Sequence, residues 1–208
     1  MPKKFNEQEK QWIRQKLLEE GKRSFEAFGL RKTSVEDLTK ASGIAQGSFY
    51  MFFGSKEELF YELLLTEEAV IRDKLLQSIG EDQAVTKESI RRFIMESFRL
   101  MSENALIRNM FFEGELEQLV RKLPKELLER NFTEDQDAMM HVVRKWQKAG
   151  ILKETRPELI VSMFRALVLL SLHKKEIGEA VYSDTIALLV NVLAEGLFVN
   201  VTKEGNPL

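Results

Sequence analysis

The sequence of 208 residues contains no cysteine and only two histidines, His141 and His173. The absence of cysteine excludes disulfide bonds, thiolate metal sites and a cysteine nucleophile, and it fits a reducing compartment. Without a thiolate or an acidic partner at ligand spacing, the two histidines give little support for a metal site, and whether they help to bind a small molecule stays open. We therefore expect neither a metal ion nor another cofactor.

Long apolar runs are also lacking. The strongest apolar stretch, residues 159–172, is broken by Ser162, Arg165 and Ser171, so no segment reaches the roughly 18 consecutive apolar residues of a membrane-spanning helix. The first ten residues, MPKKFNEQEK, contain lysines but not the apolar region of a secretory signal. These patterns predict a cytoplasmic protein without a membrane partner.

Proline occurs at only four positions, and patterns typical of β-strands are scarce, so long stretches are free to be helical. Apolar residues at helical spacing predict helices over about residues 7–28, 55–80, 90–101, 107–112, 124–149, 157–175 and 183–199. The sequence therefore predicts an all-α fold. It contains no glycine-rich phosphate loop, no G-x-S-x-G turn and no H-E-x-x-H motif, which makes an enzyme a disfavoured interpretation.

Residues 33–58 show the pattern of two short helices joined by a turn. Residues 33–36 fit a capping box that begins the first helix, Gly43 supplies the turn, and a second helix is expected over 45–52. Residues 55–58 fit another capping box, which begins the long helix. With the first helix of the chain, these elements predict a helix-turn-helix. Residues 1–54 also carry 10 Lys and Arg against 7 Asp and Glu, an excess that is compatible with contacts to phosphates.

The stretch from Thr33 to Leu59, TSVEDLTKASGIAQGSFYMFFGSKEEL, closely resembles the DNA-binding signature of the TetR family of transcriptional regulators. The matching positions are Val35, Leu38, Ala41, Gly43, Gly47, Phe49, Tyr50, Phe53, Lys56 and Leu59. The resemblance implies an N-terminal three-helix DNA-binding domain, residues 1–54, and a C-terminal helical bundle, residues 55–208, that binds an effector and dimerises. The C-terminal part agrees with the family only in length and helical character.

The resemblance further implies that the second short helix enters the major groove of double-stranded operator DNA. Gln46, Ser48 and Met51 would face bases or phosphates, and Tyr50 would contact the DNA backbone. A glutamine amide can bond adenine through N6 and N7, which makes Gln46 the main candidate for base readout. Because Ala45, Gln46 and Met51 replace residues that are more often polar or basic in the family, we expect a weak salt dependence of binding.

Four further residues complete the predicted DNA contacts. Thr33, Ser34 and Lys56 stand at helix starts, where a hydroxyl, an ammonium group and free backbone N–H groups can hold phosphates. Helix capping alone would also explain the two hydroxyls. Gly47 is costly inside a helix, so a close approach of a backbone or of a neighbouring helix is expected there.

The C-terminal helices, by the same resemblance, enclose a cavity for a small-molecule effector. An aromatic and methionine set would suit an apolar or amphipathic ligand, with ordinary core packing as the alternative for each member. The candidates are Phe93, Phe98, Met110, Phe111, Met140, Trp146 and Phe164.

The helices expected over about 157–175 and 183–199 are apolar around most of their circumference, so two faces of each must leave water. One face can pack on the core of its own chain. The other can join a four-helix interface in a two-fold homodimer, and burial within a monomer is the alternative.

Together these observations predict a ligand-responsive DNA-binding regulator, which the resemblance implies to be a repressor released from its operator by an effector. The alternative is a dimeric DNA-binding adaptor whose C-terminal domain binds a protein. The effector, the operator sequence, the regulated genes and the choice between repression and activation do not follow from the sequence.

Overall fold

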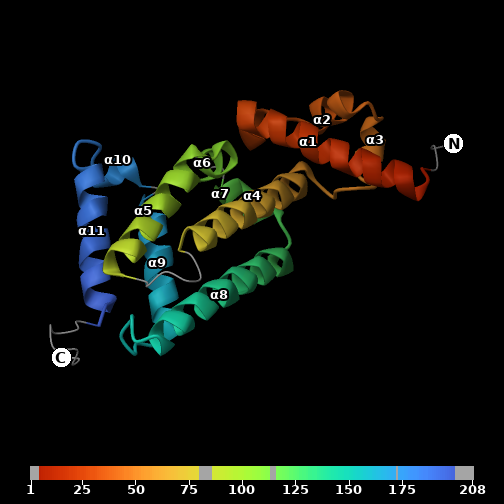
Figure 1. The fold of residues 1–208 in the computed structure, drawn as a ribbon. Helices are drawn as coiled ribbons and strands as arrows, with labels where there is room; N and C mark the ends of the chain where they lie inside the picture. The colour runs from red at the N-terminus through yellow and green to blue at the C-terminus, as the bar shows by residue number, and fades with distance from the viewer. Residues whose placement is uncertain (1–4, 80–85, 113–115, 172, 200–208) are drawn as a thin grey trace. The chain divides into compact units, whose positions relative to one another are not determined.

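The computed structural model describes residues 5–79, 86–112, 116–171 and 173–199, without the side chains of residues 76, 78–79, 111–112, 116–118 and 128–138. In this described part the regular elements are helices, and one isolated antiparallel bridge joins Leu152 to Phe198 (Figure 1). The predicted all-α class is therefore confirmed. The helices are α1 (Glu7–Lys32), α2 (Val35–Ser42), α3 (Gln46–Phe49), α4 (Lys56–Ile79), α5 (Lys87–Glu103), α6 (Ala105–Phe112), α7 (Leu116–Lys122), α8 (Lys125–Lys148), α9 (Pro157–Ser171), α10 (Lys174–Ile177) and α11 (Tyr182–Leu197).

Packing divides the chain into two compact units, Met1–Val70 with Ser102–Lys125, and Ile71–Met101 with Glu126–Leu208. The first unit thus holds α6 and α7 as well as the N-terminal helices. The predicted division after residue 54 into a DNA-binding and an effector-binding domain does not coincide with these packing units, and as a division of function it stays a prediction.

In the first unit, α1 begins at Asn6, whose side chain accepts from the Glu9 N–H while the Glu9 carboxylate accepts from the Asn6 N–H. This reciprocal pair satisfies two of the helix's unpaired donors. Ile13, Leu17 and Phe25 form its buried stripe. At Gly29 the helix is interrupted by a positive φ of 77°, close to the predicted end.

The start of α2 differs by one residue from the prediction. Ser34, not Thr33, is the N-cap: its hydroxyl accepts from the Asp37 N–H, and the Asp37 carboxylate accepts from the Ser34 N–H. The predicted box over residues 33–36 is therefore wrong. Thr33 is buried instead, and its hydroxyl donates to the Gly29 carbonyl over 2.8 Å.

Two side-chain links attach α6 to α1 and α4 within this unit. The buried Asn109 amide donates to the Phe25 carbonyl over 3.1 Å. Glu67 accepts from both Lys22 and Asn104, and its hydrogen bond and charge raise the pKa of Lys22. Since these groups are hydrogen-bonded across three helices, α6 is fixed to the N-terminal helices.

In the second unit, α9 and α11 lie side by side (Figure 1). The Tyr182 hydroxyl, at the start of α11, donates to the Ser171 carbonyl at the end of α9. The predicted helix over 157–175 is shorter than expected, because α9 ends at Ser171 and α10 is a separate turn. No helix among the residues that the structure describes is long and apolar enough to cross a membrane.

Candidate nucleic-acid interface

The turn between α2 and α3 sets the orientation of the second short helix. Gly43 adopts φ 70°, a left-handed conformation that favours glycine, and its N–H donates to the Lys40 carbonyl. The next residue donates its N–H to the Thr39 carbonyl over 3.0 Å. These bonds close the end of α2 and start α3 in a new direction, which confirms the predicted turn.

The helical part of the second element is shorter than the predicted 45–52. It covers Gln46–Phe49, and a tighter turn follows, in which Met51 and Phe52 donate to carbonyls three residues earlier. Phe49 is fully buried and meets the Phe53 ring at 5.9 Å, so the element is held by its apolar side. We call residues 46–51 the recognition turn.

The other side of the recognition turn is open to solvent. Tyr50 is 59% exposed and Met51 54% exposed, Gln46 and Gly47 are also exposed, and Ser48 is half-buried. A Cβ atom added at Gly47 would find no atom within 4 Å in the described chain. A neighbouring helix is therefore not the reason for this glycine.

Two of the predicted phosphate contacts have clear structural roles. Ser34 is exposed, and its hydroxyl and N–H hold the pKa of Asp37 below its usual value. Lys56 extends its ammonium group to the end of α1, where it donates to the carbonyls of Leu30 and Thr33, each over 2.6 Å. The ammonium group thus completes the C-terminal end of α1, a role that the sequence did not indicate.

Charge is absent from the recognition turn itself: residues 41–54 contain no Lys, Arg, Asp or Glu. Its donors and acceptors are the Gln46 amide, the hydroxyls of Ser48 and Tyr50, and backbone groups. Such a surface can read the edges of bases and touch phosphates with few ion pairs.

The predicted effector-binding residues are divided between the two units. Phe93, Met140, Trp146 and Phe164 are buried in the second unit, where Phe93 and Trp146 meet edge to face at 6.1 Å, and Phe98 is half-buried there. Met110 is buried in the first unit, and the side chain of Phe111 lies outside the described residues.

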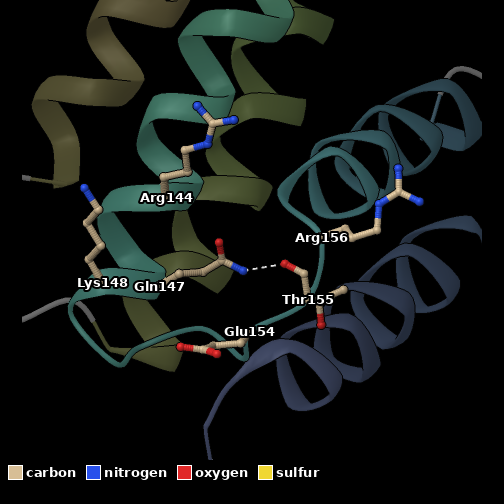
Figure 2. Close-up of a pocket in the computed structure, with 6 residues that line it drawn as sticks. All are labelled: Arg144, Gln147, Lys148, Glu154, Thr155 and Arg156. Atoms are coloured by element: carbon tan, nitrogen blue, oxygen red, sulfur yellow. Dashed lines mark hydrogen bonds between the residues drawn. The ribbon is translucent and has the colours of Figure 1, made fainter.

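A polar pocket of about 410 Å³ lies elsewhere in the second unit, between the end of α8 and the chain that leads to α9 (Figure 2). It is lined by Arg144, Gln147, Lys148, Glu154, Thr155 and Arg156, none of which is in the predicted effector set. The Gln147 amide donates to the carbonyls of Thr155 and Lys153 over 2.6 and 2.9 Å, so it fixes this loop.

Both histidines are exposed, and a ring nitrogen of His173 bonds the Leu169 carbonyl at 2.7 Å. In the part of the chain that the structure describes, no group of three His, Cys, Asp or Glu side chains is placed to hold a metal ion.

Comparison with known proteins finds a family match in the N-terminal region. The family model described as bacterial regulatory proteins, tetR family, matches residues 17–63. The HTH-type transcriptional regulator YhgD of Bacillus subtilis (strain 168) is 26% identical over 196 residues, which cover 88% of this chain and 96% of that protein. The HTH-type transcriptional repressor KstR2 of Rhodococcus jostii (strain RHA1) is 26% identical over 188 residues, 88% of this chain and 90% of that protein.

Among solved structures, a TetR-family transcriptional regulator from Pectobacterium atrosepticum superposes with a TM-score of 0.71. It is 19% identical in sequence, and the match covers 94% of this chain and 99% of that one. The likeness supports the fold assigned above, an N-terminal helix-turn-helix domain and a C-terminal helical domain.

Proposed function

We propose, on the premise that this chain belongs to the TetR family of bacterial regulatory proteins, that it is a homodimeric repressor released from operator DNA by a small-molecule effector. The coarser statement is established by the relatives: the chain is a DNA-binding transcriptional regulator and not an enzyme. The repressor role is supported by the name of one relative, a transcriptional repressor.

The observation that carries the proposal is the exposed side of the recognition turn. Tyr50 and Met51 project from a turn whose Phe49 and Phe53 anchors are buried, so large side chains stay in water at a rigidly held place. Inserted into the major groove, Gln46 reads a base edge, with about 1 to 3 kcal/mol of discrimination for a bidentate pair with adenine. The space beside Gly47 lets the DNA approach the helix backbone closely.

The contacts to phosphates come from the edges of the same unit. Ser34 is exposed at the start of α2, where a helix N-terminus attracts anions, and a phosphate bound there would take the place of the Asp37 carboxylate to which the Ser34 hydroxyl and N–H now donate. Thr33 and Lys56 have a structural role instead: each donates a hydrogen bond to a carbonyl at the end of α1 and so helps to hold the N-terminal helices together.

The effector site is proposed in the second unit, among Phe93, Phe98, Met140, Trp146 and Phe164. Phe93, Met140, Trp146 and Phe164 are buried, Phe98 is half-buried, and the Phe93 and Trp146 rings meet edge to face. These aromatic and methionine side chains suit an apolar or amphipathic ligand. Met110 and Phe111, the other two predicted effector-binding residues, belong to the first unit.

The first experiment is a gel shift of the purified protein with the DNA that flanks its own gene. We expect a discrete complex that is lost in the Gln46→Ala, Tyr50→Ala double variant and retained in Met95→Ala, which changes an exposed methionine of the second unit. If wild type and double variant shift the same fragments equally, the recognition turn does not read DNA.

A second experiment separates the sensor from the adaptor. Candidate ligands are added to the complex, and Trp146 emission is followed in a Trp12→Phe background, in which Trp146 is the only tryptophan. Release from DNA together with a change in emission supports the sensor. Release that requires a protein partner and leaves Trp146 unchanged supports the adaptor.

A further inference from the structure

The polar pocket of the second unit belongs neither to the recognition turn nor to the proposed apolar effector site. It lies between the end of α8 and the chain that leads to α9, and its volume is about 410 Å³ (Figure 2). Small-molecule sites typically enclose roughly 300 to 1,000 Å³, so the pocket is large enough for a ligand. Every lining residue has a polar side chain: three are cations, one is a carboxylate, one an amide and one a hydroxyl. The lining therefore suits a polar ligand rather than an apolar one.

The loop that forms one wall of the pocket is fixed by the protein's own hydrogen bonds. At its start, Gly150 adopts φ 68°, and its N–H donates to the Gln147 carbonyl over 2.9 Å. The side-chain amide of Gln147 donates to the carbonyls of Lys153 and Thr155. The N–H of Lys153 donates in turn to the Leu197 carbonyl at the end of α11 over 2.8 Å. A wall that is held in this way is preorganised, and a preorganised site loses less entropy when a ligand binds.

The cations of the pocket are not neutralised by neighbouring carboxylates. Among the described residues, Arg144 and Lys148 have no carboxylate partner. Neither has an acidic residue three or four positions away, the spacing at which helical side chains meet. The Nε atom of Arg156 lies 3.7 Å from a Glu158 oxygen, longer than a hydrogen bond. Because Glu154 is the one carboxylate of the lining, the lining has an excess of two positive charges.

The two arginines stand on separate walls of the pocket. Figure 2 shows Arg144 on α8 and Arg156 on the chain before α9, with the hydrogen bond from Gln147 to Thr155 between them. In this view both guanidinium groups lie on one side of that bond, and the Glu154 carboxylate lies on the other. A guanidinium group binds a carboxylate or a phosphate through two parallel N–H···O bonds. Two such groups on separate walls suit a ligand with two negative charges.

We propose that this pocket is a second small-molecule site, which binds a small organic dianion through Arg144 and Arg156, with Lys148 as a further counter-charge. A dicarboxylate and a phosphate ester share the required chemistry, two negative charges carried by acceptor oxygens. The site goes beyond the proposed function, because binding in it requires neither DNA nor the apolar effector residues. A ligand held by both arginines links the end of α8 to the chain that begins α9.

The test is equilibrium dialysis of the full-length protein against labelled succinate and, separately, labelled glycerol 3-phosphate. Sodium chloride keeps the ionic strength constant, so that general screening is the same in every sample. We expect saturable binding of at least one probe, which identifies the ligand class. The Arg144→Gln, Arg156→Gln double variant should weaken that binding roughly tenfold or more, since charged hydrogen bonds are lost. Lys145→Gln, which removes an exposed cation of α8 that does not line the pocket, is the matched control and should bind as wild type.

Three results would overturn the inference. They are no saturable binding of either probe, binding that the double variant leaves unchanged, and binding that Lys145→Gln weakens as much as the double variant does. In the last case the anion responds to the general charge of α8 and not to the pocket. None of these results bears on the gel shift with operator DNA, which tests the proposed function separately, so the two proposals can fail independently.

Discussion

Two buried hydroxyl groups of α2 differ in whether they have a hydrogen-bond partner, and this difference predicts how much each contributes to stability. Thr39 is buried in α2, and its hydroxyl donates to the carbonyls of Val35 and Glu36 over 2.9 and 3.0 Å. Ser42, one turn later and equally buried, has a hydroxyl for which the described part of the molecule offers no partner.

Removing the Ser42 hydroxyl should therefore cost nothing. We expect Ser42→Ala to leave the free energy of unfolding unchanged or to raise it by up to about 1 kcal/mol, since a buried polar group without a partner is unfavourable. Thr39→Val, in which a bonded hydroxyl is lost, should lower it by about 1 kcal/mol. Urea unfolding followed by circular dichroism measures both. A loss of stability in Ser42→Ala as large as that in Thr39→Val would mean that the Ser42 hydroxyl is bonded in solution.

Lys56 offers a choice between a phosphate contact and a structural role. Its ammonium group donates to the Leu30 and Thr33 carbonyls, so Lys56→Met should lower the free energy of unfolding by about 1.5 to 3 kcal/mol, the range for hydrogen bonds from a charged donor. Lys40→Met, at an exposed position of α2, should change it by less than about 0.5 kcal/mol. If Lys56→Met unfolds like wild type but lowers the slope of log operator affinity against log salt by about one, its ammonium group binds phosphate after all.

At the scale of elements, helical periodicity was sufficient to predict the all-α class and the positions of most helices. The prediction of helix ends failed where two neighbouring residues could each form the end. Thr33 and Ser34 are adjacent hydroxyls that could each cap α2, and only the contact between Thr33 and the Gly29 carbonyl assigns the cap to Ser34. After Pro157 at its start, the pattern to residue 175 contains no glycine or proline that would end α9, and the bond from Tyr182 to Ser171 marks that end.

The candidate site was predicted from the positions of the motif. Four of its predicted residues, Gln46, Gly47, Tyr50 and Met51, are exposed in the structure. What sequence could not give are contacts between residues far apart in the chain. The carbonyls that Lys56 meets lie 23 to 26 residues earlier. Glu67 accepts from Lys22, 45 residues earlier, and from Asn104, 37 residues later. Met110 is buried with the N-terminal helices because α6 packs on α1, which no local pattern indicated.

Two glycines around the recognition turn predict opposite effects on its stability. Gly43 has φ 70°, so Gly43→Ala should lower the free energy of unfolding by about 1 kcal/mol or more. Gly47 is helical with open space around it, so Gly47→Ala should raise stability by up to about 1 kcal/mol. The same change should weaken operator binding, because the added methyl group occupies space left for the DNA. Gly47→Ala protein that is more stable and binds equally well would show that the DNA backbone does not approach this position.

At the scale of the whole molecule, α9 and α11 each have one face that is buried and one that is apolar but exposed. Ile160, Phe164 and Leu167 of α9 and Ile186, Val190 and Leu197 of α11 are buried. The exposed positions include Leu159, Met163, Leu169 and Leu170 of α9 and Leu188, Leu189 and Val192 of α11. An apolar surface that continues over two neighbouring helices is typical of an interface between subunits.

We expect charged residues on this exposed face to separate the subunits. Leu188 is 63% and Val192 60% exposed, four residues apart on one stripe of α11, so the Leu188→Glu, Val192→Glu double variant should fold but sediment as a monomer. Val120→Glu, a change at an exposed position of α7, should stay dimeric. Since a dimer grips two half-sites about 34 Å apart, the monomer should lose most of its operator affinity while its recognition turn is intact. A double variant that remains dimeric would place the interface elsewhere, and a wild-type protein that sediments as a monomer would mean that both helices serve only the core of one chain.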